Sequence, residues 1–202
     1  MDYLELSKKN VQEKSKELFT KIKDDNYNFE LVIFIARGAL YIGQEISKLN
    51  NVPLLEIKAT RKTSFLKSII KPIMKLIPKN ILIYMRKKEM NSNYHEKNSE
   101  RKVDFNHKQF QKYKKVKKII IVDDSIDSGN TILEVKKVLE DFFDEAEFKI
   151  AALNYMEKTI IKPEYYIFSD TMLNGPWSND SKYNKEFIKK YEEWKKEYEK
   201  KF

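Results

Sequence analysis

The chain contains no cysteine, only two histidines and only four glycines among its 202 residues. Without cysteine, neither a disulfide framework nor a thiolate zinc site can form, and two histidines alone make a poor transition-metal site. The opening residues 1–5 lead into a segment rich in lysine and glutamate that lacks the apolar core of a secretory signal. We therefore expect a cytoplasmic protein, although the cysteine count by itself does not identify its redox compartment.

Long uninterrupted hydrophobic runs are also absent. The most apolar stretch, Phe65 to Met85, is broken by lysines and prolines at Lys67, Lys71, Pro72, Lys75, Pro78 and Lys79. Such a stretch does not predict a membrane-spanning helix. A chain of 202 residues is long enough for one full hydrophobic core, so we predict a single domain over residues 1–202.

Positive charge exceeds negative charge. Lysine and arginine together number 40, and aspartate and glutamate 31, for a formal net charge of +9. This charge favours a polyanionic partner: nucleic acid, an anionic membrane surface or a multiply phosphorylated substrate. The charge does not distinguish among these partners. Lysine-rich faces are also typical of solvated helices, so the charge by itself does not establish a partner.

The first part of the chain has the pattern helix, strand, helix, strand. Apolar residues recur at helical spacing from Leu4 to Ile22, and Phe29 to Ala36 is an almost continuous apolar run, typical of a strand buried on both faces. A second helical pattern spans Ala39 to Leu49, and a second strand is predicted over Leu54 to Ala59. This order predicts two parallel strands joined by a crossover helix.

The same alternation resumes later in the chain. Val116 to Val122 predicts a third buried strand and Thr131 to Phe142 a helix, followed by strands over Phe148 to Tyr155 and Tyr165 to Phe168. We therefore predict an α/β fold: a mostly parallel open sheet with helices on both faces. Residues 180–202 are predicted to form a C-terminal amphipathic helix with four aromatic residues on one face: Phe187, Tyr191, Trp194 and Tyr198.

Residues 62–115 separate the second and third predicted strands by far more chain than a crossover requires, so we interpret them as an insertion with a mobile loop. The apolar half, Phe65 to Ile77, is expected to pack on the protein or on a dimer partner; we favour this over a peripheral membrane contact. His95 and His107 are expected at the surface. Basic residues that could reach a site from this region are Arg61, Lys62, Arg86, Lys87 and Lys88.

The strongest motif in the chain is IIIVDDSIDSGNTI, residues 119–132. Backbone N–H groups of Asp127 to Thr131 and the start of the following helix can converge on a phosphate, with the hydroxyls of Ser128 and Thr131 as further donors. Asp123 and Asp124 would repel that phosphate unless they face sugar hydroxyls or a hydrated magnesium ion. The combination indicates a phosphorylated sugar as ligand.

This motif resembles the diagnostic segment of the type I phosphoribosyltransferases: a hydrophobic strand, two acids, two variable residues, then Asp or Thr, Thr or Ser, Gly and Thr. The resemblance implies that phosphoribosyl pyrophosphate is the donor and that Mg²⁺ is the cofactor. It assigns Asp123 and Asp124 to the ribose 2- and 3-hydroxyls, in indirect contact with magnesium through the metal-bound substrate. It assigns the 5-phosphate to the loop that contains Ser128, Gly129, Asn130 and Thr131.

Asp127 is the candidate catalytic base. In purine-specific members of the family the matching acid lies near the acceptor ring, and a carboxylate within hydrogen-bond reach of the acceptor nitrogen can take its proton. The alternative is that Asp127 only caps the following helix.

A second match to the family lies at Ala36, Arg37 and Gly38, which resemble its pyrophosphate loop. Glycine allows the backbone to approach an anion closely, and the Arg37 guanidinium offers charge-assisted hydrogen bonds to the leaving pyrophosphate. We therefore place Arg37 with Asp127 as a candidate catalytic residue. Ala39 stands where the family usually has a second glycine.

Residues 164–177 resemble the small hood of the xanthine/guanine (6-oxopurine) phosphoribosyltransferases. Met172 and Leu173 are the candidate acceptor contacts, because an apolar pair suits a flat ring; the alternative is that they fill a core. Those enzymes also place a lysine at the end of the fourth strand. Here Asn154 or Tyr155 occupies that position, and Lys158, a few residues later, is the candidate acceptor residue.

The leading interpretation is an enzyme that transfers the 5-phosphoribosyl group to a 6-oxopurine base, as in purine salvage and nucleotide metabolism. One alternative keeps the donor but uses a non-purine acceptor, such as a sugar hydroxyl in glycan assembly. Another is a regulator of this fold that binds the donor or a nucleotide and uses its basic surface on RNA or DNA. Asp127 and Arg37 favour catalysis, so we expect a small-molecule acceptor and no nucleic acid partner. We also expect a homodimer.

Overall fold

The computed structural model describes residues 2–61, 81 and 101–200 of the chain. Its strands are β1 (Asp2–Glu5), β2 (Leu31–Ala36), β3 (Leu54–Arg61), β4 (Arg101–Phe105), β5 (Lys118–Ile126), β6 (Glu147–Tyr155), β7 (Tyr165–Ser169) and β8 (Thr171–Asn174). Its helices are α1 (Lys8–Asp24), α2 (Leu40–Asn50), α5 (His107–Gln111), α6 (Asn130–Phe142) and α7 (Asn184–Lys200).

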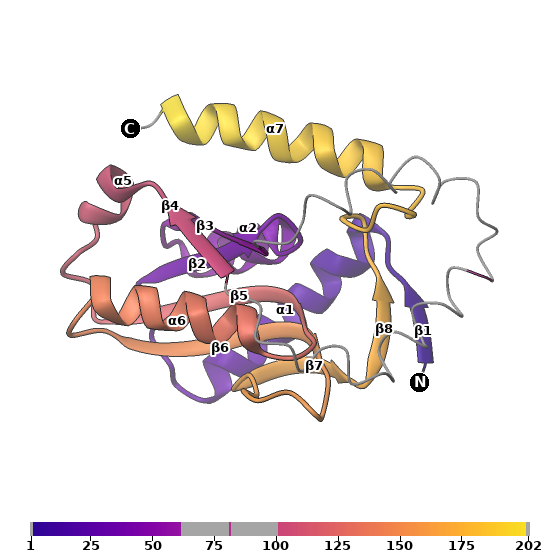
Figure 1. Cartoon of the computed structure of the whole chain (residues 1–202), viewed down its shortest axis with the longest axis horizontal. Helices are drawn as coiled ribbons and strands as arrows, with labels where there is room; N and C mark the ends of the chain where they lie inside the picture. The colour runs from indigo at the N-terminus through magenta and orange to yellow at the C-terminus, as the bar shows by residue number, and fades with distance from the viewer. Residues whose placement is uncertain (1, 62–80, 82–100, 201–202) are drawn as a thin grey trace.

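The main sheet has six strands in the order β4-β3-β2-β5-β6-β7 (Figure 1). Strands β3, β2, β5, β6 and β7 are parallel to one another, and β4 is antiparallel to β3. The order turns back between β2 and β5, as in doubly wound folds, where ligands bind beyond the carboxyl ends of the strands. The mostly parallel sheet predicted from the sequence is confirmed.

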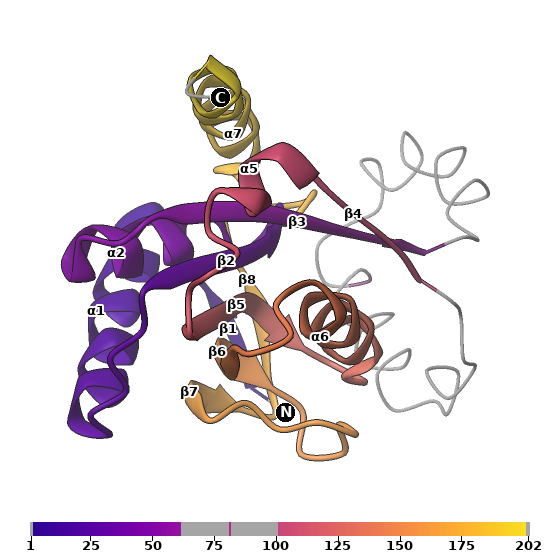
Figure 2. The same cartoon turned by 90° about the vertical axis from the view of Figure 1, so that its left-hand side faces the viewer.

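Helices cover both faces of this sheet, α1 and α2 on one side and α6 on the other (Figure 2). Successive residues of β2 point to opposite faces: Val32 and Phe34 belong to the core cluster under α1 and α2, and Leu31 and Ile33 to the cluster under α6. All four are fully buried. Because β2 is buried on both faces, its sequence is continuously apolar and carries no alternation.

The chain opens differently from the prediction. We expected a helix from Leu4, but residues 2–5 form β1, which pairs in parallel with β8, and the helix α1 begins only at Lys8. Ser7 is its N-cap: the Ser7 hydroxyl accepts a hydrogen bond from the Asn10 N–H at 3.2 Å. The small hood that we expected is thus a two-stranded sheet built from residues far apart in the chain.

The described part of the predicted insertion contains regular structure. Residues 101–105 form β4 at the edge of the main sheet, and α5 follows directly. His107 is exposed on α5, as expected, with its ring 4.3 Å from that of Phe105. Residues 62–80 and 82–100, and with them the predictions for Lys62, the stretch 65–77, Arg86, Lys87, Lys88 and His95, lie outside the described residues.

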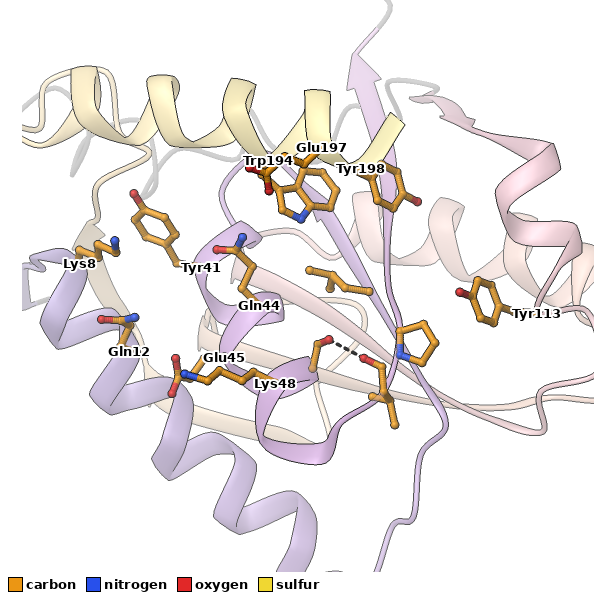
Figure 3. A pocket seen from close by; sticks show the side chains of 14 residues that line it. Lys8, Gln12, Tyr41, Gln44, Glu45, Lys48, Tyr113, Trp194, Glu197 and Tyr198 are labelled. Carbon is orange, nitrogen blue, oxygen red and sulfur yellow. Dashed lines mark hydrogen bonds between the residues drawn. The ribbon is translucent and has the colours of Figure 1, made fainter. Parts of the chain in front are cut away.

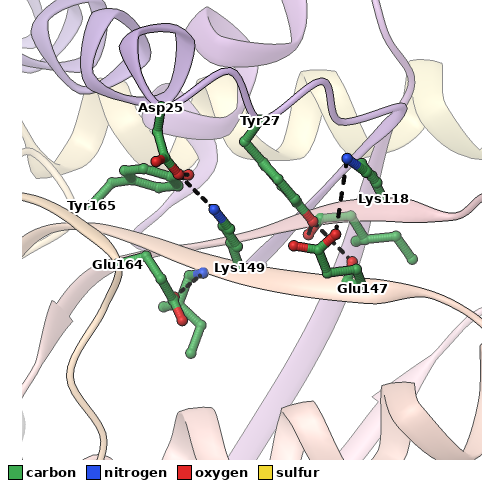
Figure 4. Close-up of polar contacts among 9 residues, drawn as sticks. Asp25, Tyr27, Lys118, Glu147, Lys149, Glu164 and Tyr165 are labelled. Carbon is green, nitrogen blue, oxygen red and sulfur yellow. Dashed lines mark hydrogen bonds and ion pairs between the residues drawn. The ribbon is translucent and has the colours of Figure 1, made fainter.

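A polar cluster joins the amino ends of several strands (Figure 4). The Tyr27 hydroxyl donates to the backbone carbonyls of Glu147 at 2.9 Å and Ile119 at 3.1 Å. Asp25 accepts from Lys149 at 2.5 Å and from the Tyr165 hydroxyl at 2.6 Å, and these two partners hold the pKa of Asp25 below its usual value. This end of the sheet is thus occupied by structural contacts, and the opposite, carboxyl end carries the candidate site residues.

The C-terminal helix α7 packs on β2 and β3 through the aromatic face predicted from the sequence. The Trp194 ring meets Phe34 edge-on at 5.1 Å and stacks on Tyr198 at 4.5 Å, and Tyr191 donates a hydrogen bond to the Glu56 carboxylate. Within residues 2–61, 81 and 101–200, no helix has the length and apolar character of a membrane span.

Candidate functional site

The predicted phosphate loop lies between the end of β5 and the start of α6. Gly129 is the N-cap of α6 and has a φ of 84°, a conformation that favours glycine. A glycine cap brings no side chain to the first N–H groups of the helix, which are suited to bind an anion. The alternative that Asp127 is the helix cap is wrong, because the cap is two residues further on.

Five of the predicted residues line one small cavity of about 70 Å³ at this loop. They are Asp123, Asp127, Ser128, Gly129 and Thr131. The other described residues in the lining are Arg101, Ser125, Ile126 and Ile132. Asn130 contacts one of the lining residues: its side-chain amide donates a hydrogen bond to the Ser128 hydroxyl at 3.2 Å. The donor half of the predicted site is therefore assembled in space.

The two adjacent acids are held at the end of β5. Asp123 is 7% exposed and accepts a hydrogen bond from the Asp124 N–H at 2.9 Å. Burial, followed by repulsion from Asp124, raises the pKa of Asp123 well above its usual value. Burial and then repulsion from Asp127 raise the pKa of Asp124 to about 7. Such carboxylates are stabilised when a ligand brings hydroxyl donors or a cation to them.

The predicted pyrophosphate loop directly follows β2, and the peptide bond between Ala36 and Arg37 is cis. Gly38 lies against the Asp124 carboxylate: a Cβ added there would stand 2.0 Å from Asp124 Oδ1. The two loops are therefore in direct contact, and a side chain at position 38 would displace the Asp124 carboxylate. Arg37 is exposed to solvent.

The loop between β6 and β7 packs against the phosphate loop. The Ile160 N–H donates to the Ser128 carbonyl at 3.2 Å. A Cβ added at Gly129 would stand 2.6 Å from the Thr159 hydroxyl oxygen and 2.8 Å from a methyl carbon of Ile161. This role of residues 159–161 was not predicted, because no local sequence pattern marks it.

Neither residue at the position of the family lysine is free to bind an acceptor. Asn154 is fully buried: its amide donates to the Ser125 hydroxyl at 3.1 Å, and its carbonyl accepts from the Thr171 N–H at 3.3 Å. Tyr155 is 3% exposed and donates to the Glu157 carboxylate. Asn154 therefore connects the donor strand β5 to the hood strand β8.

The predicted acceptor residues do not line the cavity at the phosphate loop. Met172 is 4% exposed in β8, and the adjacent Leu173 packs against the core cluster under α1 and α2. Neighbouring residues of a strand point to opposite faces, so these two side chains do not share a face. Lys158 is exposed in the turn after β6. Their roles at an acceptor stay predictions.

Trp177 joins the hood to the donor half. Its side chain hydrogen-bonds to Asp124, an interaction that opposes the rise in the pKa of that carboxyl group. Its ring covers Gly175, where an added Cβ would stand 2.4 Å from the indole. Trp177 thus lies next to the acids assigned to the ribose.

A larger cavity of about 570 Å³ lies elsewhere, between α1, α2, α7 and the start of β3 (Figure 3). Its lining includes Lys8, Tyr41, Glu45 and Trp194. None of the predicted site residues in the described part of the chain lines it. The predicted chemistry is thus associated with the smaller cavity, where the two loops meet.

Magnesium is the metal that the resemblance implies. Carboxylate oxygens such as those of Asp123 and Asp124 are ligands that this hard cation prefers, so the residues fit it. Among the residues that the structure describes, no group of three or more acids, histidines or cysteines gathers as a metal site. The two acids are therefore suited to contact an ion that the substrate also holds.

A mostly parallel α/β sheet with two loops that meet beside adjacent acids at its carboxyl edge is the arrangement expected of a phosphoribosyltransferase. A family model described as "Phosphoribosyl transferase domain" matches residues 3–182. The chain therefore belongs to the phosphoribosyltransferase domain family and is an enzyme of that class.

Solved structures share this fold at low identity. The purine phosphoribosyltransferase of Pyrococcus horikoshii has a TM-score of 0.59 at 20% identity, over 88% of this chain and 95% of that one. The xanthine-guanine-hypoxanthine phosphoribosyltransferase of Helicobacter pylori has a TM-score of 0.62 at 18% identity, over 91% and 99%. A hypothetical protein of Neisseria gonorrhoeae with bound ppGpp has a TM-score of 0.62 at 17% identity, over 95% and 96%. The search of curated proteins found no match.

Proposed function

We propose that this enzyme transfers the 5-phosphoribosyl group from phosphoribosyl pyrophosphate to a 6-oxopurine base and releases pyrophosphate. The observation that carries the proposal is the contact between the two loops, in which Gly38 lies against Asp124 beside the cavity lined by Asp123, Ser128 and Thr131. A donor with a phosphate at one end and a pyrophosphate at the other requires two anion-binding loops separated by ribose-binding acids.

In the proposed reaction, the bond from ribose C1 to the pyrophosphate oxygen breaks, and a bond from C1 to a purine ring nitrogen forms. Pyrophosphate leaves with the electron pair of the broken bond, and Arg37 binds its charge. The ring nitrogen loses its proton to Asp127, which is exposed at the mouth of the cavity. Asp123 and Asp124 accept hydrogen bonds from the ribose hydroxyls and orient the sugar.

Magnesium bound to the donor would neutralise the negative charge of the leaving pyrophosphate. Asp123 and Asp124 would hold it indirectly, through the ribose hydroxyls and water. Binding of the metal-bearing donor also favours the ionised form of the two acids, whose pKa values are raised by burial and by neighbouring carboxylates.

The oxopurine acceptor is supported by the likeness of the fold to purine and xanthine-guanine-hypoxanthine enzymes. A specific observation favours a second candidate, transfer from the same donor to a non-purine acceptor such as a sugar hydroxyl. Both Asn154 and Tyr155, at the position of the family lysine, are buried and already hydrogen-bonded within the protein. The cytoplasmic location and a homodimer remain part of the proposal.

The test is pyrophosphate release from phosphoribosyl pyrophosphate and magnesium in the presence of guanine, xanthine, hypoxanthine, adenine, orotate or no acceptor. The matched control is the double variant Asp123→Asn/Asp124→Asn. Release with an oxopurine that disappears in the double variant supports the proposal. Donor binding without turnover on any base would contradict the oxopurine acceptor and direct the search to non-base acceptors.

A further inference from the structure

Among the residues that the structure describes, Arg101 is the basic residue that lines the cavity at the phosphate loop, together with Ser128, Gly129 and Thr131. From this position we infer that Arg101 binds the 5-phosphate of the donor and is a substrate-binding residue of this enzyme. The inference rests on the proposed function for the identity of the donor. It adds a cation to a loop for which the sequence indicated only backbone N–H groups and hydroxyls.

The register of the sheet directs Arg101 to this loop. Strand β4 pairs with β3 so that Arg101 lies opposite Arg61, at the carboxyl end of β3. Along β4, residues 101, 103 and 105 are partly buried and residues 102 and 104 are exposed. Val103 and Phe105 pack on the core cluster that contains Ile132 of α6. Arg101 shares their face of the strand and so lies on the side of α6 and its amino end.

The carboxylates around the cavity are the reason why a basic residue such as Arg101 is needed for phosphate binding. Asp123 and Asp127 line the same cavity, and Asp124 is next to them. A phosphate entering this space meets carboxylates at close range, and like charges repel one another strongly in a partly buried site. A guanidinium in the lining compensates this repulsion and forms charge-assisted hydrogen bonds to phosphate oxygens.

Arg101 and Arg37 would then serve opposite ends of one substrate. Arg37 follows β2 in the pyrophosphate loop, and Arg101 begins β4 beside the phosphate loop. The two arginines therefore predict separate losses: one in the affinity for pyrophosphate, the other in the affinity for a sugar phosphate. A residue that only supports the fold would not separate the two ligands in this way.

The experiment compares Arg101→Gln, Arg101→Lys and Arg37→Gln with the wild type by calorimetric titration of ribose 5-phosphate and, separately, of magnesium pyrophosphate. The matched control is Lys102→Gln, which removes the same charge from the adjacent residue on the exposed face of β4. Thermal unfolding of each variant is measured alongside.

We expect Arg101→Gln to weaken ribose 5-phosphate binding by about 10- to 100-fold and pyrophosphate binding by less than about threefold. Arg101→Lys should recover part of the loss, and Arg37→Gln should show the reverse pattern. Lys102→Gln should bind both ligands like the wild type.

Unchanged ribose 5-phosphate affinity in Arg101→Gln would overturn the inference, as would equal loss of both ligands. Absence of ribose 5-phosphate binding by the wild type would overturn it as well. The proposed acceptor is tested independently, because wild-type enzyme that binds ribose 5-phosphate through Arg101 but turns over no base would contradict only the oxopurine reaction.

Discussion

The carboxylate of Asp124 lies directly over the α-carbon of Gly38, so that a methyl group at Gly38 would stand 2.0 Å from Oδ1 and 2.5 Å from Cγ. Asp124 belongs to the ribose-binding acids of our proposal and Gly38 to the pyrophosphate loop. This contact sets the distance between the two ends of the donor site.

Replacing Gly38 by alanine should displace the Asp124 carboxylate from its place against the pyrophosphate loop. Because displacement of reacting groups by about 1 Å can lower turnover by about 100-fold, we expect Gly38→Ala to lose about that factor in kcat/KM for the donor. The measurement is steady-state pyrophosphate release at varied donor concentration. Gly43→Ala is the control: its Cβ would stand 3.0 Å from Leu54 and Phe34 in the core, so it tests packing and should keep the donor affinity. Near wild-type kcat/KM in Gly38→Ala would show that the loops adjust without cost.

The raised pKa of Asp124 predicts how stability varies with pH. The folded protein keeps this proton to about pH 7, whereas the unfolded chain releases it near 3.8. The resulting contribution to the free energy of unfolding is fully present below pH 3.8 and is lost as pH rises through about 7. Asp123 acts in the same direction.

Asp124→Asn should therefore raise the free energy of unfolding by an amount on the order of 1 kcal/mol at about pH 8, and by less at about pH 4. Urea unfolding at the two pH values measures this difference. Asp141→Asn removes an exposed carboxylate from α6 and should show no such pH dependence. An equal effect of Asp124→Asn at both pH values would refute the assignment of the raised pKa.

The hydrogen bond from Tyr191 to Glu56 predicts a large effect on stability. Glu56 is 9% exposed, and its other carboxylate oxygen is 3.6 Å from Lys58. Tyr191→Phe leaves this carboxylate without its hydroxyl donor, so we expect a loss of about 1.5–3 kcal/mol in urea unfolding.

Lys190→Gln is the matched control in the same helix. Its partner Glu193 lies 2.8 Å away, and both side chains are more than two-fifths exposed, at 47% and 43%. Surface pairs of this kind contribute little, so we expect a change within about 0.5 kcal/mol. Equal losses in the two variants would contradict a specific role for the Glu56 contact.

Asn154 connects the donor half to the hood, so its replacement should affect both. Asn154→Leu leaves the Ser125 hydroxyl and the Thr171 N–H without this partner, and we expect a loss of about 1–3 kcal/mol in stability. Asn154→Asp keeps the acceptor for Thr171 and should lose less.

A positioning role of Asn154 also predicts a split in kinetics. Because Thr171 begins the hood strand, Asn154→Asp should lower kcat more than it weakens donor binding measured by calorimetry. Proportional losses in kcat and donor affinity would indicate a general loss of structure instead.

The central strands and the donor loop were predictable from the sequence. Strands β2 and β5 are buried on both faces, so each appears as a continuous apolar run, and a phosphate-binding turn requires glycine and hydroxyls in a recognisable order. Both signals are local. The strands are confirmed and Gly129 caps the following helix, while the binding of phosphate by this turn stays a prediction.

Strands β1 and β4 were not predicted, because their stability comes from distant partners. Residues 2–5 and 101–105 are short and partly polar, and they become strands by pairing with β8 and β3. The position of Arg101 beside the donor loop depends on the pairing of β4 with β3, and that of Asn154 on the register between β5 and β6. No spacing in the sequence indicates them.

The hood has a consequence for the order of folding. Its two strands, β1 and β8, are paired so that Asp2 lies opposite Thr171, which makes this the pairing of greatest sequence separation in the described sheets. Closing so long a loop is entropically unfavourable before the intervening chain is compact. We therefore expect the main sheet to form first and the hood to close late, so that a newly made chain can acquire the two loops at the edge of the main sheet before its hood is complete.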